Sequence, residues 1–204
     1  MTAPRIILAS GSAIRRDILA SAGVPFEVMK PDVDEDVIKA EGKAEGVDLE
    51  TLAMRLAEAK CLDIAEKEGA AKTNAIVIGS DQIMEFEGRA YDKPATMADA
   101  KARLMETRGA PHTLINAIAV ARQGRIIWRN LDRPTLVMRA LSEREIDDYL
   151  AAAGPEILYS VGAYMVEKLG SRLFERIDGD HFAVLGLSLF PLLDLLRQEG
   201  ALDF

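Results

Sequence analysis

The stretch Arg5–Gly23, RIILASGSAIRRDILASAG, joins an apolar run to small residues and two adjacent arginines. A strand, a small-residue turn and a helix start together suit a bound phosphate, because free N–H groups at a helix N-terminus point at the anion. Ser10 and Ser12 add hydroxyl donors. Arg15 and Arg16 follow about one turn later, where their guanidinium groups reach back to phosphate oxygens. The alternative is a Ser N-cap followed by two solvated arginines.

Carboxylates occur at two places that suit catalysis or metal binding. Asp81 ends the segment AIVIGSD, and residues after the strands of open α/β sheets line the ligand crevice. There a carboxylate acts as a base or a metal ligand, or it only bonds its own backbone in a turn. The run PDVDED, which contains Glu35, offers hard oxygen ligands for Mg²⁺ or Mn²⁺, or is simply a solvated acidic loop.

Two lysines complete the set of candidate groups. Lys60 lies on the apolar i+4 row of a predicted helix over 49–68, where it either snorkels from the core edge or points into a cleft towards an anion. Lys93 precedes Pro94, which keeps its backbone extended and suits a projecting charge. Cations and hydroxyls beside carboxylates suit a metal-dependent reaction on a polyphosphate.

Composition sets limits on the partners of the chain. The 204 residues carry a net charge of −8, and 49% of them are apolar, which is typical of a soluble globular domain. So acidic a chain lacks the broad basic face that nucleic acids or an anionic membrane would need, although a small anion remains compatible. Cys61 is the only cysteine, which rules out an intramolecular disulfide and, with no signal peptide visible, favours the cytoplasm.

The elements that must position these residues alternate between strands and helices. The patterns predict strands at 6–9, 26–29 and 75–78, helices at 12–22, 49–68, 96–107 and 189–198, and a hairpin of 112–122 with 125–129 around Gln123–Gly124. A capping box from Ser142 to Glu145 predicts a further helix to about residue 152. This order indicates an α/β fold with a mixed sheet, and residues 108–111 are a candidate hinge between lobes.

The motifs, taken in order, resemble those of one family. ILASGSAIRRDIL resembles the N-terminal signature of the Maf family, nucleoside triphosphate pyrophosphatases first linked to septum formation. The resemblance continues through PDVDE, LAEAK, VIGSDQ, YDKP, SVGAY and LFERIDGDHFAVLGLSLFPLL, and it covers nearly the whole chain. The GSDQ form, in place of ADT, is similar to the branch that contains 7-methyl-GTP pyrophosphatases.

The resemblance implies a fold, a reaction and a site. The fold is a single domain over residues 1–204, with an elongated mixed sheet flanked by helices and two lobes around a cleft. The reaction converts a nucleoside triphosphate and water to the monophosphate and pyrophosphate with Mg²⁺, Mn²⁺ or Co²⁺, as a house-cleaning hydrolase of nucleotide metabolism in the cytoplasm. The implied partners are the substrate and, as a homodimer, a second copy. The implied catalytic residue is Asp81, the metal ligands are Glu35 and Asp81, and the triphosphate contacts are Ser12, Arg15, Arg16, Lys60 and Lys93.

Two departures from the family pattern leave alternatives open. Ala13 replaces a usual Pro, and Met165 replaces a Gln or Lys that can contact substrate, although a thioether cannot donate a hydrogen bond. The base preference therefore stays open. A second hypothesis is a nucleotide-binding regulator of cell division, a septum formation inhibitor with little or no turnover. A third is a phosphatase that releases the γ-phosphate, which product identity would separate.

Overall fold

The computed structural model describes residues 3–69 and 74–204. Two short 3₁₀ helices, η1 (Pro155–Tyr159) and η2 (Leu169–Leu173), occur beside the regular α-helices and β-strands. In chain order these are β1 (Ile6–Ala9), α1 (Ala13–Ser21), β2 (Glu27–Met29), α2 (Glu35–Glu45), α3 (Leu49–Lys67), β3 (Ile76–Phe86), β4 (Arg89–Tyr91), α4 (Met97–Thr107), β5 (Pro111–Arg122), β6 (Arg125–Asp132), β7 (Thr135–Met138), α5 (Glu143–Ala153), β8 (Phe174–Asp178), α6 (His181–Val184) and α7 (Leu189–Gln198).

Hydrogen bonding joins the strands in the order β2-β1-β3-β5-β7-β8, with β4 on β3 and β6 on β5. Strand β1 is parallel to β2 and to β3, whereas β4, β6, β7 and β8 pair antiparallel. The predicted α/β class with a mixed sheet flanked by helices is confirmed. Within the described residues, no helix is both long enough and apolar enough to cross a membrane.

The chain divides into two compact units. Unit 1 holds the described residues up to Asp81, with Asn116–Asp132 and His181–Phe204. Unit 2 holds Gln82–Ile115 and Arg133–Asp180. Residues 108–111, the candidate hinge, lie inside unit 2, and two of the passages between units fall within β3 and β5. Because both passages lie inside continuous strands, no linker-like run of residues marks them in the sequence.

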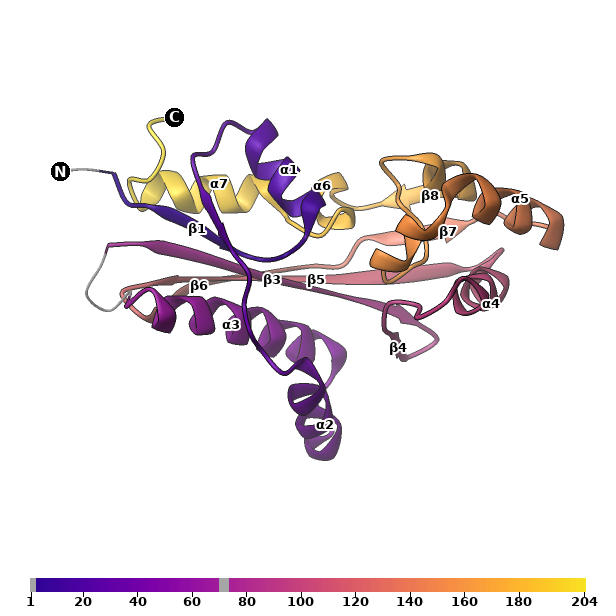
Figure 1. Cartoon of the computed structure of the whole chain (residues 1–204), viewed down its shortest axis with the longest axis horizontal. Coiled ribbons are helices and arrows are strands. Elements are labelled where there is room, and N and C mark those ends of the chain that lie inside the picture. The colour runs from indigo at the N-terminus through magenta and orange to yellow at the C-terminus, as the bar shows by residue number, and fades with distance from the viewer. Residues whose placement is uncertain (1–2, 70–73) are drawn as a thin grey trace. The chain divides into compact units, whose positions relative to one another are not determined.

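Unit 1 packs helices on both faces of its strands. All four residues of β1 are buried, and α1 and α7 cover one face while α3 covers the other (Figure 1). On the first face Ile6 and Leu8 share a core cluster with Leu19 of α1 and Leu192 of α7. The alternation of strand side chains explains why β1 serves both faces. The predicted helix 49–68 is confirmed as α3, and the predicted hairpin as β5 and β6.

Strand β3 corrects one prediction. The sequence predicts a strand that ends at residue 78 with Asp81 beyond it, but β3 continues through Gly79, Ser80 and Asp81 to Phe86. The glycine has a packing role here, because a Cβ on Gly79 would lie 2.3 Å from the carbonyl oxygen of Ala57 in α3. Its backbone thus lets helix and strand approach closely, and Asp81 projects from the strand rather than from a turn.

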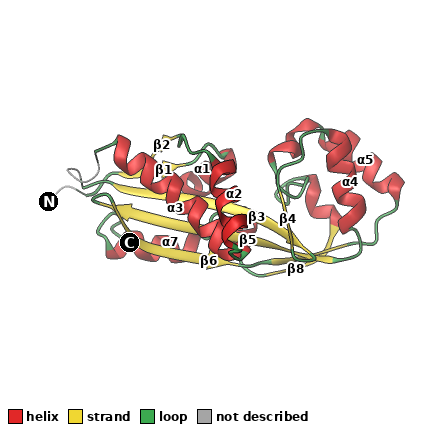
Figure 2. Cartoon of the chain, turned by 90° about the horizontal axis from the view of Figure 1, so that it is seen from below, coloured by secondary structure: helices red, strands yellow, loops and turns green. Residues whose placement is uncertain are grey.

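Unit 2 contains two helices with the predicted kind of N-terminus. Thr96 and Asp99 form a reciprocal capping box at α4, and Ser142 and Glu145 form another at α5. The two helices lie side by side (Figure 2). Each box satisfies backbone donors that the first turn leaves free, which is why these local signals predict the helix starts well.

Candidate active site

Lys60 lies between two carboxylates in unit 1. Its Nζ is 2.6 Å from Asp81 Oδ1 and 2.8 Å from Glu35 Oε1. The side chains of Lys60 and Asp81 are only 12% and 10% exposed, whereas Glu35 is 42% exposed. Lys60 therefore points to a partly buried charge cluster instead of snorkelling to solvent. Two carboxylates and one ammonium converge on one point from three different elements.

Local structure explains this convergence. The close approach at Gly79 brings α3 against β3, so that Lys60 on the helix reaches Asp81 on the strand. Glu35 is the first residue of α2, whose N-terminus is capped by the Asp34 side chain. The reading of PDVDED as a solvated loop is thus wrong at its end. A cap at Asp34 and acids in the first turn favour a helix start there.

The donor set fits a divalent cation held partly by substrate. Among the described residues, no group of three or more His, Cys, Asp or Glu side chains gathers as a metal cage. Glu35 and Asp81 nonetheless direct carboxylate oxygens to the same cation, the Lys60 ammonium. Mg²⁺ in proteins is often bound by one or two carboxylates and completed by phosphate oxygens and water. The residues present fit that mode of binding.

The Ser12 turn begins α1 as the sequence predicts. Ser12 is the N-cap, and its Oγ accepts a hydrogen bond from Arg15 N at 3.5 Å. The Ser12 N–H in turn donates to Ser10 Oγ at 3.2 Å. Arg16 is exposed and lies 3.3 Å from the Asp17 carboxylate. The turn has the N-cap geometry, and Arg16 is the solvated arginine of the two.

Arg15 makes hydrogen bonds to the backbone of two distant segments. Its Nε donates to Gly186 O and its terminal nitrogen to Ser80 O, each at 2.8 Å. Burial lowers the pKa of this guanidinium, while the negative charges of Asp81 and Glu35 act in the opposite direction. Arg15 therefore joins α1 to β3 and to the C-terminal segment, and its charge acts on the carboxylate pair.

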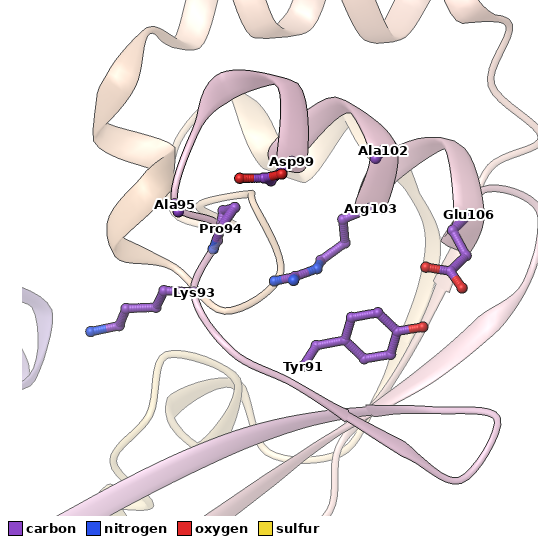
Figure 3. Close-up of a pocket in the computed structure, with 8 residues that line it drawn as sticks. All are labelled: Tyr91, Lys93, Pro94, Ala95, Asp99, Ala102, Arg103 and Glu106. Atoms are coloured by element: carbon purple, nitrogen blue, oxygen red, sulfur yellow. The ribbon is translucent and has the colours of Figure 1, made fainter. Parts of the chain in front are cut away.

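Lys93, the remaining predicted residue, belongs to unit 2. It is exposed and lines a pocket of about 370 Å³ between the end of β4 and α4 (Figure 3). The wall of the same pocket includes Arg103, whose guanidinium stands over the ring of Tyr91 at 4.9 Å. Neither Arg103 in the pocket wall nor the Gly186 carbonyl that accepts from Arg15 could be identified from the sequence. A backbone carbonyl has no sequence signature, and Arg103 occurs in an ordinary amphipathic helix.

Comparison with known proteins gives one family over most of the chain. The family model described as "Maf: Maf-like protein" matches residues 5–199. A nucleoside triphosphate pyrophosphatase of Maricaulis maris is 47% identical over 98% of both chains. A protein of the same name from Caulobacter vibrioides is 43% identical over 99% of both chains. A 7-methyl-GTP pyrophosphatase of Rhizobium meliloti is 42% identical over 98% of both.

A solved structure gives a weaker match. The nucleoside-triphosphatase, or dITP/XTP pyrophosphatase, of Mycobacterium abscessus aligns with 96% of this chain and 94% of its own. The identity is 13% and the TM-score 0.38, too low to establish a common fold. The family assignment rests instead on the family model and on the full-length relatives at more than 40% identity. The chain belongs to the Maf family.

Proposed function

We propose that this chain hydrolyses nucleoside triphosphates to the monophosphate and pyrophosphate. The observation that carries the proposal is the meeting of Asp81 and Glu35 at the ammonium of Lys60. Full-length relatives named nucleoside triphosphate pyrophosphatase and 7-methyl-GTP pyrophosphatase support it. Both names occur at similar identity, so ordinary and methylated nucleotides are both candidate substrates.

Asp81 is the proposed catalytic residue. Its carboxylate is 10% exposed and held at one oxygen by Lys60, so that its orientation is fixed. In the proposed reaction it positions the attacking water and accepts a proton from it while the water approaches the α-phosphorus. The bond between the α-phosphorus and the oxygen that bridges it to the β-phosphate then breaks. Pyrophosphate leaves with this oxygen and with the negative charge that develops on it during the attack.

Glu35 and Asp81 would hold the divalent cation, Mg²⁺, Mn²⁺ or Co²⁺, which supplies Lewis-acid stabilisation of phosphate charge when bound. Lys60 is proposed to place its ammonium on the phosphate oxygens, because it lies within 2.8 Å of both carboxylates that would hold the cation. Cations on the leaving pyrophosphate stabilise the transition state more than the ground state, since the charge there grows during the reaction.

The other proposed triphosphate contacts are the start of α1 and three further cationic residues. Ser12 and the start of α1 offer a hydroxyl and first-turn N–H groups, which favour an anion. Arg16 and Lys93 are exposed cations on their respective units. Arg15 makes hydrogen bonds to carbonyls, so we propose that it acts mainly through its charge and by holding the turn.

The cellular setting is part of the same proposal. We propose a cytoplasmic protein whose two units act as one domain, with a second copy as its macromolecular partner and no role for nucleic acid or membrane. The family resemblance supports the homodimer. The single cysteine and the net charge of −8 support the compartment and the absence of polyanionic partners.

Met165 favours one alternative function. A thioether stands where relatives commonly carry a donor, so a regulator that binds nucleotide with little turnover is the second candidate. In that case the triphosphate would bind with similar affinity to the wild type and to a protein lacking the Asp81 carboxylate, and neither would release pyrophosphate.

The test is product analysis with Mn²⁺ on ordinary and methylated nucleoside triphosphates, comparing wild type with Asp81→Asn. We expect pyrophosphate and monophosphate from wild type, and a kcat lower by about 10²- to 10⁴-fold in the variant, the range for loss of a general base. Asp147→Asn in α5, an exposed carboxylate that pairs with Lys101, is the control and should leave kcat unchanged. Orthophosphate and diphosphate as products would contradict the proposal.

A further inference from the structure

Arg103 connects two segments of unit 2 that are far apart in the sequence. Its terminal nitrogen donates hydrogen bonds to the backbone carbonyls of Asp92 and Val161. Asp92 immediately precedes Lys93, and Val161 begins the segment that leads to Met165. The guanidinium also stands over the Tyr91 ring, as Figure 3 shows. One side chain of the pocket wall therefore holds both the backbone next to Lys93 and the backbone at Val161.

The burial of this guanidinium is costly. Desolvation lowers the pKa of Arg103, and its Nε is buried without a hydrogen-bond partner among the described residues. An unpaired buried donor reduces stability, and a Leu or Met would fill the same space without that cost. The two carbonyl contacts are what an apolar side chain cannot supply. The arrangement indicates that position 103 serves the geometry of the two segments more than packing.

The segment held at Val161 has a constrained backbone. Ala163 is fully buried and has a φ of 60°, in the region that favours glycine. A Cβ on Gly162 would lie 2.2 Å from the ring of Tyr164, whose hydroxyl is 2.6 Å from His112 Nε2. Strained residues persist only where the surroundings fix them, and such places are often binding sites.

We propose that Arg103 is a positioning residue for nucleotide binding. By holding the carbonyls of Asp92 and Val161 it keeps Lys93, which lines the pocket of unit 2, in a fixed arrangement with the segment 161–165. The proposal rests on the proposed function, in which Lys93 contacts the triphosphate. Arg103 itself acts on the backbone, so it should affect substrate affinity far more than the chemical step.

The experiment compares Arg103→Met, Arg103→Lys and the control Arg89→Met. Arg89 also lies over Tyr91, at 5.5 Å, but it pairs with Glu106 on the surface. We expect KM to rise about tenfold in R103M with kcat within twofold, since one charged hydrogen-bonding group is lost outside the reacting atoms. R103K keeps the charge and a donor and should lie between. R89M should match wild type.

Hydrogen exchange of the free protein gives a second readout. Amides of 91–95 and 160–166 should exchange faster in R103M and at the wild-type rate in R89M, because Arg103 bonds to both segments whereas Arg89 pairs with Glu106. A wild-type KM in R103M, or unchanged exchange in either segment, would overturn the proposal. Failure of the proposed function appears separately, as a wild-type protein without turnover. The exchange experiment needs no substrate and then decides the inference alone.

Discussion

Lys60 in unit 1 and Lys101 in unit 2 are each placed between two carboxylates at almost the same distances. Lys60 has its partners at 2.6 and 2.8 Å, and Lys101 has Asp147 and Glu143 at 2.7 and 2.8 Å. The two clusters differ in exposure. The Lys60 side chain is 12% exposed, whereas Lys101 is 33% exposed and its partners are 51% and 63% exposed.

Distance alone therefore does not identify a functional charge cluster. Water screens the charges of the Lys101 cluster, which connects α4 to α5 as an ordinary surface ion pair. Hydrogen bonds to Asp147 and Glu143 raise the pKa of Lys101. Around Lys60 the charges interact in a less polar environment, and each loses more solvation. Charge kept at that cost is typical of sites that bind or react. Three predictions test how far burial determines the energetics of charged groups in the two units.

The largest effect should come from a buried titratable group of unit 2. His112 is 2% exposed, and burial lowers its pKa from 6.5 to about 4. The unfolded chain binds the proton near pH 6.5 and the folded chain only near pH 4. The stabilising contribution is therefore complete above pH 6.5 and is lost as the pH falls towards 4, by about 3 kcal/mol. We expect this loss of unfolding free energy if burial determines the cost of charging a side chain in unit 2 as it does around Lys60 in unit 1.

Urea unfolding between pH 7 and 4 measures this loss, with His112→Gln as the variant. Gln keeps a polar contact to Tyr164 but cannot titrate, so the difference in unfolding free energy from wild type should shrink as the pH falls. His181→Gln is the control, because His181 is exposed. A difference that stays constant from pH 7 to 4 would show that His112 is not held neutral by burial.

The second prediction removes each lysine in turn. Lys60→Met removes the ammonium that lies between two carboxylates and should lower the unfolding free energy by about 2 kcal/mol, below the range for fully buried pairs because Glu35 is 42% exposed. Lys101→Met should leave the melting temperature nearly unchanged. Thermal melts at low and high salt are the measurement. Equal losses in both variants would erase the distinction drawn from burial.

The smallest effect concerns metal binding. Without the ammonium, the carboxylates of Glu35 and Asp81 should bind Mn²⁺ about tenfold more tightly in Lys60→Met, since a charged hydrogen bond no longer competes. Electron paramagnetic resonance of free Mn²⁺ measures this in the absence of nucleotide. Lys67→Met is the control on the same helix, because Lys67 pairs with Asp63 at 2.9 Å. Weaker Mn²⁺ binding in Lys60→Met would remove these carboxylates as metal ligands.

Signals from neighbouring residues predicted individual elements of the fold, whereas contacts between distant segments could not be predicted from the sequence. The helix start at residue 96, the Ser142 cap and the turn at Gln123–Gly124 depend on neighbours in the chain, and all three are confirmed. The sequence also selected the residue types of the Lys60 cluster. The sequence does not show that these side chains lie together, because Gly79 resembles a turn glycine and its close contact with α3 is visible only in the structure. The hydrogen bonds of Arg15 could not be predicted either, because its backbone acceptors belong to remote segments.

The single thiol of the chain lies beside this same close contact. Cys61 follows Lys60 in α3, its Sγ donates to Val77 O of β3 at 3.1 Å, and burial raises its pKa to about 12. An alkylating reagent that needs a thiolate therefore meets no reactive group while helix and strand stay together. Each labelled molecule records one separation of the two elements that carry Lys60 and Asp81. The rate of labelling thus reports how often the charge cluster comes apart, and it needs no introduced cysteine.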